Sequence, residues 1–207
     1  TGRTLAEFRM ASGLGPILKH SADLDRYAKI IADTRPEIIV ECGTNAGASA
    51  AWFARQDLDV VTIDINPRYG DRRVLAVQQP DAVRRITYVV GSTLDPAIVE
   101  QVWELVSGRR CMVSLDSDHT AAHVGREIEL YGPLVSPGCY LVVEDGIFRY
   151  ASPAQWRRHH FGDPAYGNPL DAIEAVLTRD PHWRRDIDIE RTHPISHHPA
   201  GWWVRQP

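Results

Sequence analysis

The stretch CMVSLDSDHTAAHVGREIELYGPLVSPGCYLVVED (111–145) predicts a strand, a helix and a second strand. Both strands are apolar and stop abruptly on carboxylates, the first on Asp116 and the second on Glu144 and Asp145. The helix between them ends at the stop signal Ser-Pro-Gly (136–138). Ligands of open α/β sheets bind at the carboxyl ends of parallel strands, so we expect the three carboxylates to converge on one site.

Helix-like and strand-like apolar spacings alternate along the rest of the chain. Helices are predicted over 22–33, 46–55, 96–106, 121–134 and 170–178. Strands are predicted over 38–44, 60–65, 86–92, 111–116 and 139–145, with two more over 186–192 and 201–207. This order predicts an α/β, Rossmann-like fold, in which a mostly parallel sheet is closed by an antiparallel C-terminal hairpin strand.

The 207 residues suit one domain over 1–207, with an N-terminal helical cap over 1–35 and a substrate lid over 147–169. A hydrophobic content of 43% is ordinary for a soluble globular protein, and a net charge of −4 indicates no nucleic-acid or membrane partner. No run approaches the roughly 18 apolar residues of a membrane span. The three cysteines are expected in a reduced core, so a cytoplasmic location is the default.

A glycine-containing turn, ECGTNAG (41–47), lies where the first strand turns into a helix. Gly43 suits a tight turn, and Gly47 permits close approach of a ligand or of the helix to the sheet. The pattern is neither G-x-G-x-x-G nor a P-loop. About 20 residues later the second strand ends on Asp64, which is placed to accept hydrogen bonds from the ribose of an adenosine cofactor. A structural turn with a surface aspartate is the alternative.

The acids at the two strand ends offer only hard oxygen ligands, which favours Mg²⁺, Mn²⁺ or Ca²⁺ over zinc. A cation there would orient a substrate with two adjacent hydroxyls and lower the pKa of one of them. His119 follows Asp116 by three residues near a helix start, so we expect it in the same crevice as the general base. Support of the metal site or capping of the helix is the alternative role. His193, His197 and His198 lack zinc spacing and are expected in the hairpin turn.

With these residues in place, the chain resembles class I S-adenosylmethionine (SAM)-dependent methyltransferases. More narrowly it resembles the cephalosporin hydroxylase-like family, which includes rhamnosyl and macrolide-sugar O-methyltransferases. The resemblance rests on IIVECGTNAGASA (38–50), VVTIDI (60–65), GSTLDP (91–96), the block 115–145 and GNPLDAIEAVL (167–177). Such enzymes have a seven-stranded sheet with a reversed last strand, which agrees with the predicted hairpin.

The resemblance implies roles for individual residues. Cofactor contacts are implied for Glu41, Gly43 and Gly47 at the methionine part, Asp64 at the ribose, Ser92 and Asp95 near adenine, and Asp116. Related enzymes hold Mg²⁺ with the acids that align with Asp116, Glu144 and Asp145, and a histidine in the place of His119 deprotonates the acceptor hydroxyl. Cys42 departs from the Thr that family members often carry there.

We therefore expect a Mg²⁺-dependent O-methyltransferase that moves a methyl group from SAM to a hydroxyl of a sugar or other diol-bearing secondary metabolite, as in antibiotic tailoring. A catechol-like diol is also open. The alternatives are a hydroxylase or hydroxylase partner of the cephalosporin hydroxylase type and a binding module without catalysis. A hydroxylase would need two histidines and one carboxylate around iron, for which His119 and His123 are the candidates. Related enzymes often assemble from several subunits, so a homo-oligomer is expected.

Overall fold

A computed structural model describes residues 19–66, 80–152 and 164–207. Residues 1–18 of the expected N-terminal cap and residues 153–163 of the expected lid lie outside the described residues. Within the described residues no helix is both long enough and apolar enough to cross a membrane.

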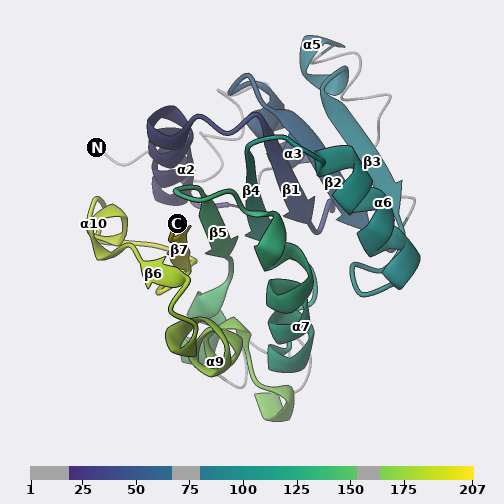
Figure 1. Cartoon of the computed structure of the whole chain (residues 1–207). Helices are drawn as coiled ribbons and strands as arrows, with labels where there is room; N and C mark the ends of the chain where they lie inside the picture. The colour runs from purple at the N-terminus through teal and green to yellow at the C-terminus, as the bar shows by residue number, and fades with distance from the viewer. Residues whose placement is uncertain (1–18, 67–79, 153–163) are drawn as a thin grey trace.

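The strands of the described residues form one seven-stranded sheet in the order β3-β2-β1-β4-β5-β7-β6 (Figure 1). They are β1 (Ile38–Cys42), β2 (Asp59–Asp64), β3 (Ile86–Val90), β4 (Cys111–Leu115), β5 (Tyr140–Val143), β6 (Trp183–Arg185) and β7 (Trp202–Arg205). Strands β1 to β5 pair in parallel, whereas β7 runs antiparallel to both β5 and β6. The predicted α/β fold with a reversed C-terminal strand is confirmed.

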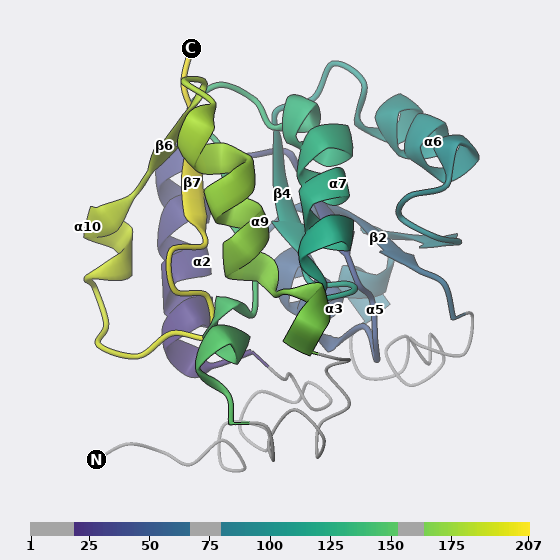
Figure 2. The same ribbon diagram turned by 90° about the horizontal axis from the view of Figure 1, so that it is seen from below.

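Helices cover both faces of the sheet, as Figure 2 shows. One face carries α2 (Ser21–Thr34), α3 (Ala48–Ala54) and α5 (Pro80–Val83), and the other carries α6 (Pro96–Val106), α7 (Ala121–Tyr131) and α9 (Pro169–Ala175). Every residue of β1, β4 and β5 is buried, which explains why these strands are continuous apolar runs rather than alternating ones. The order of strands reverses between β1 and β4, and a ligand crevice is expected at that point.

The predicted strand over 186–192 is wrong. This segment contains a short helix, α10 (Ile187–Glu190), and the strand that pairs with β7 is β6, which precedes it. Asp186 causes the change, because its carboxylate accepts hydrogen bonds from the backbone N–H groups of Asp188 and Ile189 and so starts a helix. Ile187 and Ile189 alternate with acidic residues as in a half-buried strand, in which both would face the same side. In the short helix they face different sides, so Ile187 is exposed and Ile189 is buried.

A buried ion pair on α2 holds the segment that leads to β7. Asp23 and Arg26 lie one helical turn apart, both side chains are fully buried, and Arg26 Nη1 is 2.8 Å from Asp23 Oδ1. The Arg26 guanidinium also donates to the backbone carbonyls of four residues: Ile189, Glu190, His193 and Ile195. The C-terminal segment is thereby fixed against the N-terminal helix.

Candidate active site

A cavity of about 940 Å³ opens at the carboxyl ends of the central strands. Among the expected site residues, the cavity is lined by Gly43, Asp64, Ser92, Asp116, His119, Glu144 and Asp145. Glu41, Gly47 and Asp95 do not line it. The sheet therefore brings most of the expected residues to one crevice, as the strand-end pattern predicts.

Gly43 lies at the tip of β1 with a left-handed φ of 99°. A Cβ there would lie 1.9 Å from the backbone oxygen of Asp116, so only glycine allows β1 and β4 to meet this closely. Gly47 has a φ of 76° and is the residue before α3. Its role in the structure is thus to turn the chain into the helix.

Asp64 links the end of β2 to the glycine turn. Its Oδ2 accepts hydrogen bonds from the backbone N–H groups of Thr44 and Asn45 at 3.1 and 3.0 Å, and its Oδ1 accepts from Asn66 at 2.9 Å. A carboxylate can accept about four hydrogen bonds, so the described residues leave one acceptor position of Asp64, which lines the cavity, unused.

The remaining expected cofactor residues differ in their surroundings. Glu41 is fully buried under the crevice, where Thr62 donates a hydrogen bond to it at 2.7 Å. Burial, opposed by the Lys19 charge, raises the pKa of Glu41 to about 7. Ser92 faces the cavity, whereas Asp95 caps α6 by accepting from the N–H of Ala97.

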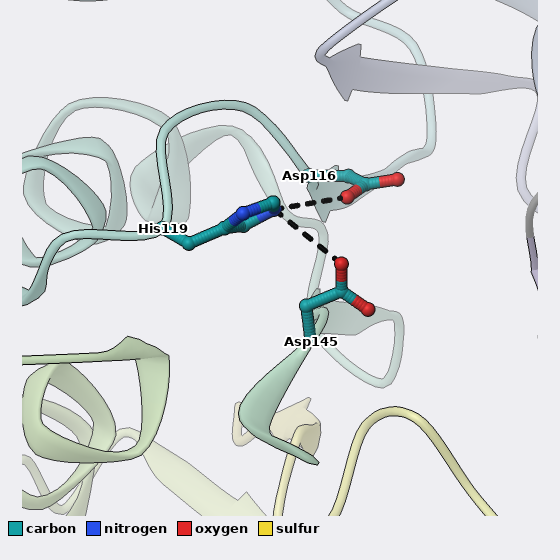
Figure 3. A group of neighbouring side chains, drawn as sticks. All are labelled: Asp116, His119 and Asp145. Carbon is teal, nitrogen blue, oxygen red and sulfur yellow. Dashed lines mark hydrogen bonds and ion pairs between the residues drawn. The ribbon is translucent and has the colours of Figure 1, made fainter. Parts of the chain in front are cut away.

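Three side chains from neighbouring strand ends form a group that can hold a metal ion. Asp116 follows β4, Asp145 follows β5 and His119 precedes α7, and one ligand atom from each lies within 4.8 Å of the others. His119 Nε2 points between the two carboxylates, 3.4 Å from Asp116 Oδ1 and 3.5 Å from Asp145 Oδ2 (Figure 3). Carboxylate oxygens suit Mg²⁺ or Mn²⁺, and imidazole is compatible with the latter, so the donor set fits a divalent cation.

Glu144, the third expected metal ligand, is not part of this group. Its Oε1 accepts hydrogen bonds from Tyr27 Oη at 2.7 Å and Ser114 Oγ at 2.5 Å, and the side chain is 1% exposed. Its Oε2 accepts from Lys19 Nζ at 2.5 Å. The expected trio of carboxylates is therefore divided, because protein donors hold Glu144 while Asp116 and Asp145 face His119.

Lys19 supplies a positive charge that the sequence pattern does not reveal. Its Nζ donates to Asp116 Oδ2 at 2.8 Å as well as to Glu144, so one ammonium group bridges two of the expected metal ligands. Burial disfavours the charged form, but Asp116, Glu144 and Glu41 outweigh this effect and raise the pKa of Lys19. No motif surrounds Lys19 in the sequence, so only the fold could place it here.

The charges in the cluster shift the pKa values of Asp116 and Asp145 in opposite directions. Burial opposes ionisation of Asp116, yet Lys19 and His119 lower its pKa well below the usual range. Burial and the neighbouring Asp116 charge raise the pKa of Asp145 to about 6. Burial disfavours protonation of His119, but hydrogen bonding to Asp116 and the charge of Asp145 raise its pKa. The cluster thus has an excess of negative charge that a cation would neutralise.

An iron site of the hydroxylase type is not present among the described residues. The metal-binding group there contains one histidine and two aspartates. His123, the other candidate, has its Nε2 3.0 Å from Thr93 Oγ1 and 3.3 Å from Glu127 Oε1. It therefore belongs to a separate hydrogen-bonded group with Thr93 and Glu127 and does not complete a set of two histidines and one carboxylate.

Comparison with known proteins agrees with this architecture. A family model described as Rhamnosyl O-methyltransferase/CmcI matches residues 10–206. The Rhamnosyl O-methyltransferase of Mycobacterium tuberculosis (strain ATCC 25618 / H37Rv) is 32% identical over 197 residues, which cover 90% of this chain and 74% of the relative. That of Mycobacterium leprae (strain TN) is 30% identical over 199 residues, or 91% of this chain and 80% of the relative.

Solved structures share the fold at lower sequence identity. CmcI with Mg and SAM has a TM-score of 0.65 at 19% identity and covers 100% of this chain and 82% of that chain. The MycE methyltransferase from the mycinamycin biosynthetic pathway, in complex with Mg and SAH, has a TM-score of 0.57 at 19% identity and covers 88% of this chain and 48% of that chain. The family match over nearly the whole length, together with the mycobacterial relatives, shows that the chain belongs to the Rhamnosyl O-methyltransferase/CmcI family of class I SAM-dependent methyltransferases.

Proposed function

We propose that the protein transfers a methyl group from SAM to a hydroxyl group of a sugar or other diol-bearing natural product, with a divalent metal ion in the site. One observation supports the proposal most directly. The group Asp116, His119 and Asp145 lies in the same cavity as Gly43 and Asp64, so the proposed cation site and the proposed adenosine site would adjoin each other. A cavity of about 940 Å³ is large enough for a cofactor and part of an acceptor.

The cofactor is proposed to lie across the ends of β1 and β2. Asp64, already oriented by the glycine turn, would accept hydrogen bonds from the ribose hydroxyls, and Ser92 would border the adenine. Glu41 would act from beneath Gly43 on the positively charged methionine part, through the negative charge it carries when ionised. Gly47 and Asp95 would support this site by shaping the turns before α3 and α6.

Asp116 and Asp145 are proposed to hold the cation, with Glu144 and Lys19 fixing Asp116 from behind. A bound divalent cation would hold the acceptor oxygens and lower the pKa of the reacting hydroxyl. His119 Nε2 would then take the proton of that hydroxyl. SAM would supply the methyl group: the freed oxygen electron pair would bond to the methyl carbon as the carbon–sulfur bond breaks, and S-adenosylhomocysteine would leave. His119 must be neutral for this step, and the two carboxylates that raise its pKa are those a cation would neutralise.

A sugar hydroxyl is the proposed acceptor because the relatives in mycobacteria are rhamnosyl O-methyltransferases and MycE is also described in complex with Mg, SAH and Mycinamycin VI. The lining of the cavity includes the apolar residues Ile147 and Phe148. The Phe148 ring packs edge-on against His119, with the ring centroids 4.8 Å apart. These apolar groups suit the less polar face of a deoxysugar.

Calorimetry with SAM, followed by a methyl-transfer assay on rhamnosyl glycosides with and without chelator, tests the proposal. Asp116→Asn is expected to lower the rate by at least about 100-fold, because it removes charge where the reacting oxygen is stabilised. Asp59→Asn is the matched control, since Asp59 lies at the opposite end of its strand, away from the cavity. Absence of SAM binding would contradict the proposed activity. Full activity in excess chelator would remove the metal from the mechanism.

A further inference from the structure

A buried histidine outside the metal-binding group contacts both acids at the tip of β5. His198 is 1% exposed, and its Nδ1 accepts a hydrogen bond from the backbone N–H of Asp145 at 3.0 Å. Its Nε2 lies 3.2 Å from Glu144 Oε2. This second contact is electrostatic, because the ring N–H is not aligned on the carboxylate as a hydrogen bond requires.

The backbone that His198 holds is an unusual one. Asp145 has a left-handed φ of 56°, a conformation that is uncommon for a residue with a side chain and that the surroundings must maintain. The same backbone decides where the Asp145 carboxylate points, and Figure 3 shows it directed toward Asp116 and His119. A hydrogen bond to the Asp145 N–H therefore acts on the direction of a proposed metal ligand.

The position of His198 is itself fixed by α2. Asp23 accepts hydrogen bonds from Ser196 Oγ at 2.6 Å and from the N–H of His197 at 2.8 Å, and Ser196 Oγ in turn accepts from the N–H of His198. On the other side, the N–H of Val143 donates to the carbonyl of Gly201. The imidazole is thus held between the ion-paired helix and strand β5, and it has little freedom to move away from Asp145.

We propose that His198 is a positioning residue for the metal site, which fixes the left-handed backbone of Asp145 and so aims its carboxylate at Asp116 and His119. The inference rests on the proposed function, because it presupposes a divalent cation between these aspartates. His198 is not part of the metal-binding group and would act on it through the backbone of Asp145. Partners that orient metal ligands in this way commonly change metal affinity by about 10–100-fold when they are removed.

Mn²⁺ binding to the full chain, measured by calorimetry with electron paramagnetic resonance as a second readout, tests the inference without turnover. His198→Asn keeps an acceptor close to the Nδ1 position and is expected to bind Mn²⁺ nearly as the wild type does. His198→Gln reaches toward the Nε2 position but lacks that acceptor, so a loss of about 10–100-fold is expected. His193→Ala is the control from the same segment, because the contact with Arg26 uses its backbone carbonyl.

The asparagine and glutamine variants decide the outcome without an alanine variant, since both keep a polar side chain in the buried position. Equal Mn²⁺ affinities of these two variants and the wild type would overturn the inference and leave the proposed function standing. Absence of Mn²⁺ binding to the wild type would overturn both. SAM binding measured on the same samples is expected to stay unchanged, and a parallel loss of SAM binding in His198→Gln would show a general disruption and overturn the positioning role.

Discussion

Arg26→Ala is expected to destabilise the protein strongly, although Arg26 lies outside the cavity lining. The substitution leaves the Asp23 carboxylate buried without its ion-pair partner and frees four backbone carbonyls from the guanidinium. Removing one partner of a buried ion pair typically costs about 3–5 kcal/mol. For a domain of this size 1 kcal/mol corresponds to a change of about 2–4 °C in Tm, so we expect Tm to fall by about 6–20 °C.

Thermal unfolding followed by circular dichroism at neutral pH measures this effect. Lys29→Ala is the matched control on the same helix, because the Lys29–Asp33 pair is exposed at 56% and 60% and such pairs contribute little. The double variant Asp23→Asn/Arg26→Ala is expected to recover part of the loss, since no charge is then left buried alone. A fall in Tm for Arg26→Ala as small as that for Lys29→Ala would refute the structural reasoning.

Three further predictions concern the cavity. Gly43→Ala is expected to lower Tm and abolish SAM binding, because its Cβ would lie 1.9 Å from the Asp116 carbonyl oxygen. Gly108→Ala is the control, since a Cβ there has nothing within 4 Å and the substitution costs only the strain of a left-handed φ. Equal melting curves of the two variants would contradict this prediction. Asp145 has a pKa of about 6 in the folded protein, above its ordinary value of 3.8, so it contributes stability below pH 4 that is lost as pH rises through about 6. In metal-free protein, Asp145→Asn should remove that decline from a Tm–pH series, and an unchanged slope would show that Asp145 is not its source. Lys19→Met is expected to lower the Tm of the metal-free protein and to enlarge the increase in Tm caused by Mn²⁺, because Asp116 and Glu144 lose the ammonium group that they share. A smaller Mn²⁺ effect than in the wild type would count against this arrangement.

The sequence predicts the sheet well because its central strands are uninterrupted apolar runs whose ends carry chemically distinctive residues. It predicts that Asp64, Asp116 and Asp145 reach one crevice, since that follows from the carboxyl ends of parallel strands. It fails at 186–192, where one capping aspartate converts a strand-like alternation into a helix.

The contacts of Glu144 are a second feature that the sequence does not predict, for a different physical reason. A strand-end carboxylate looks the same in the sequence whether it faces a metal or a buried lysine. The partners of Glu144 are Tyr27, Ser114 and Lys19, which are 117, 30 and 125 positions away. Periodicity and local motifs carry no information about such distant partners. The contact of His198 with Asp145 is not predicted for the same reason, because the two residues are 53 positions apart.

The contacts of Lys19 and His198 at the tip of β5 also have a consequence for the order in which the molecule forms. Lys19 closes on Glu144 from one end of the described chain, and His198 reaches Asp145 from the other. Contacts between such distant residues form late, because a long loop must close before they are gained. During synthesis, the tip of β5 can therefore complete its contacts only after His198, 53 residues beyond Asp145, has been made. A nascent chain that stops before His198 would have the parallel strands but would lack the hydrogen bond that holds the Asp145 backbone. The site would therefore be complete only when the last strands pack against β5.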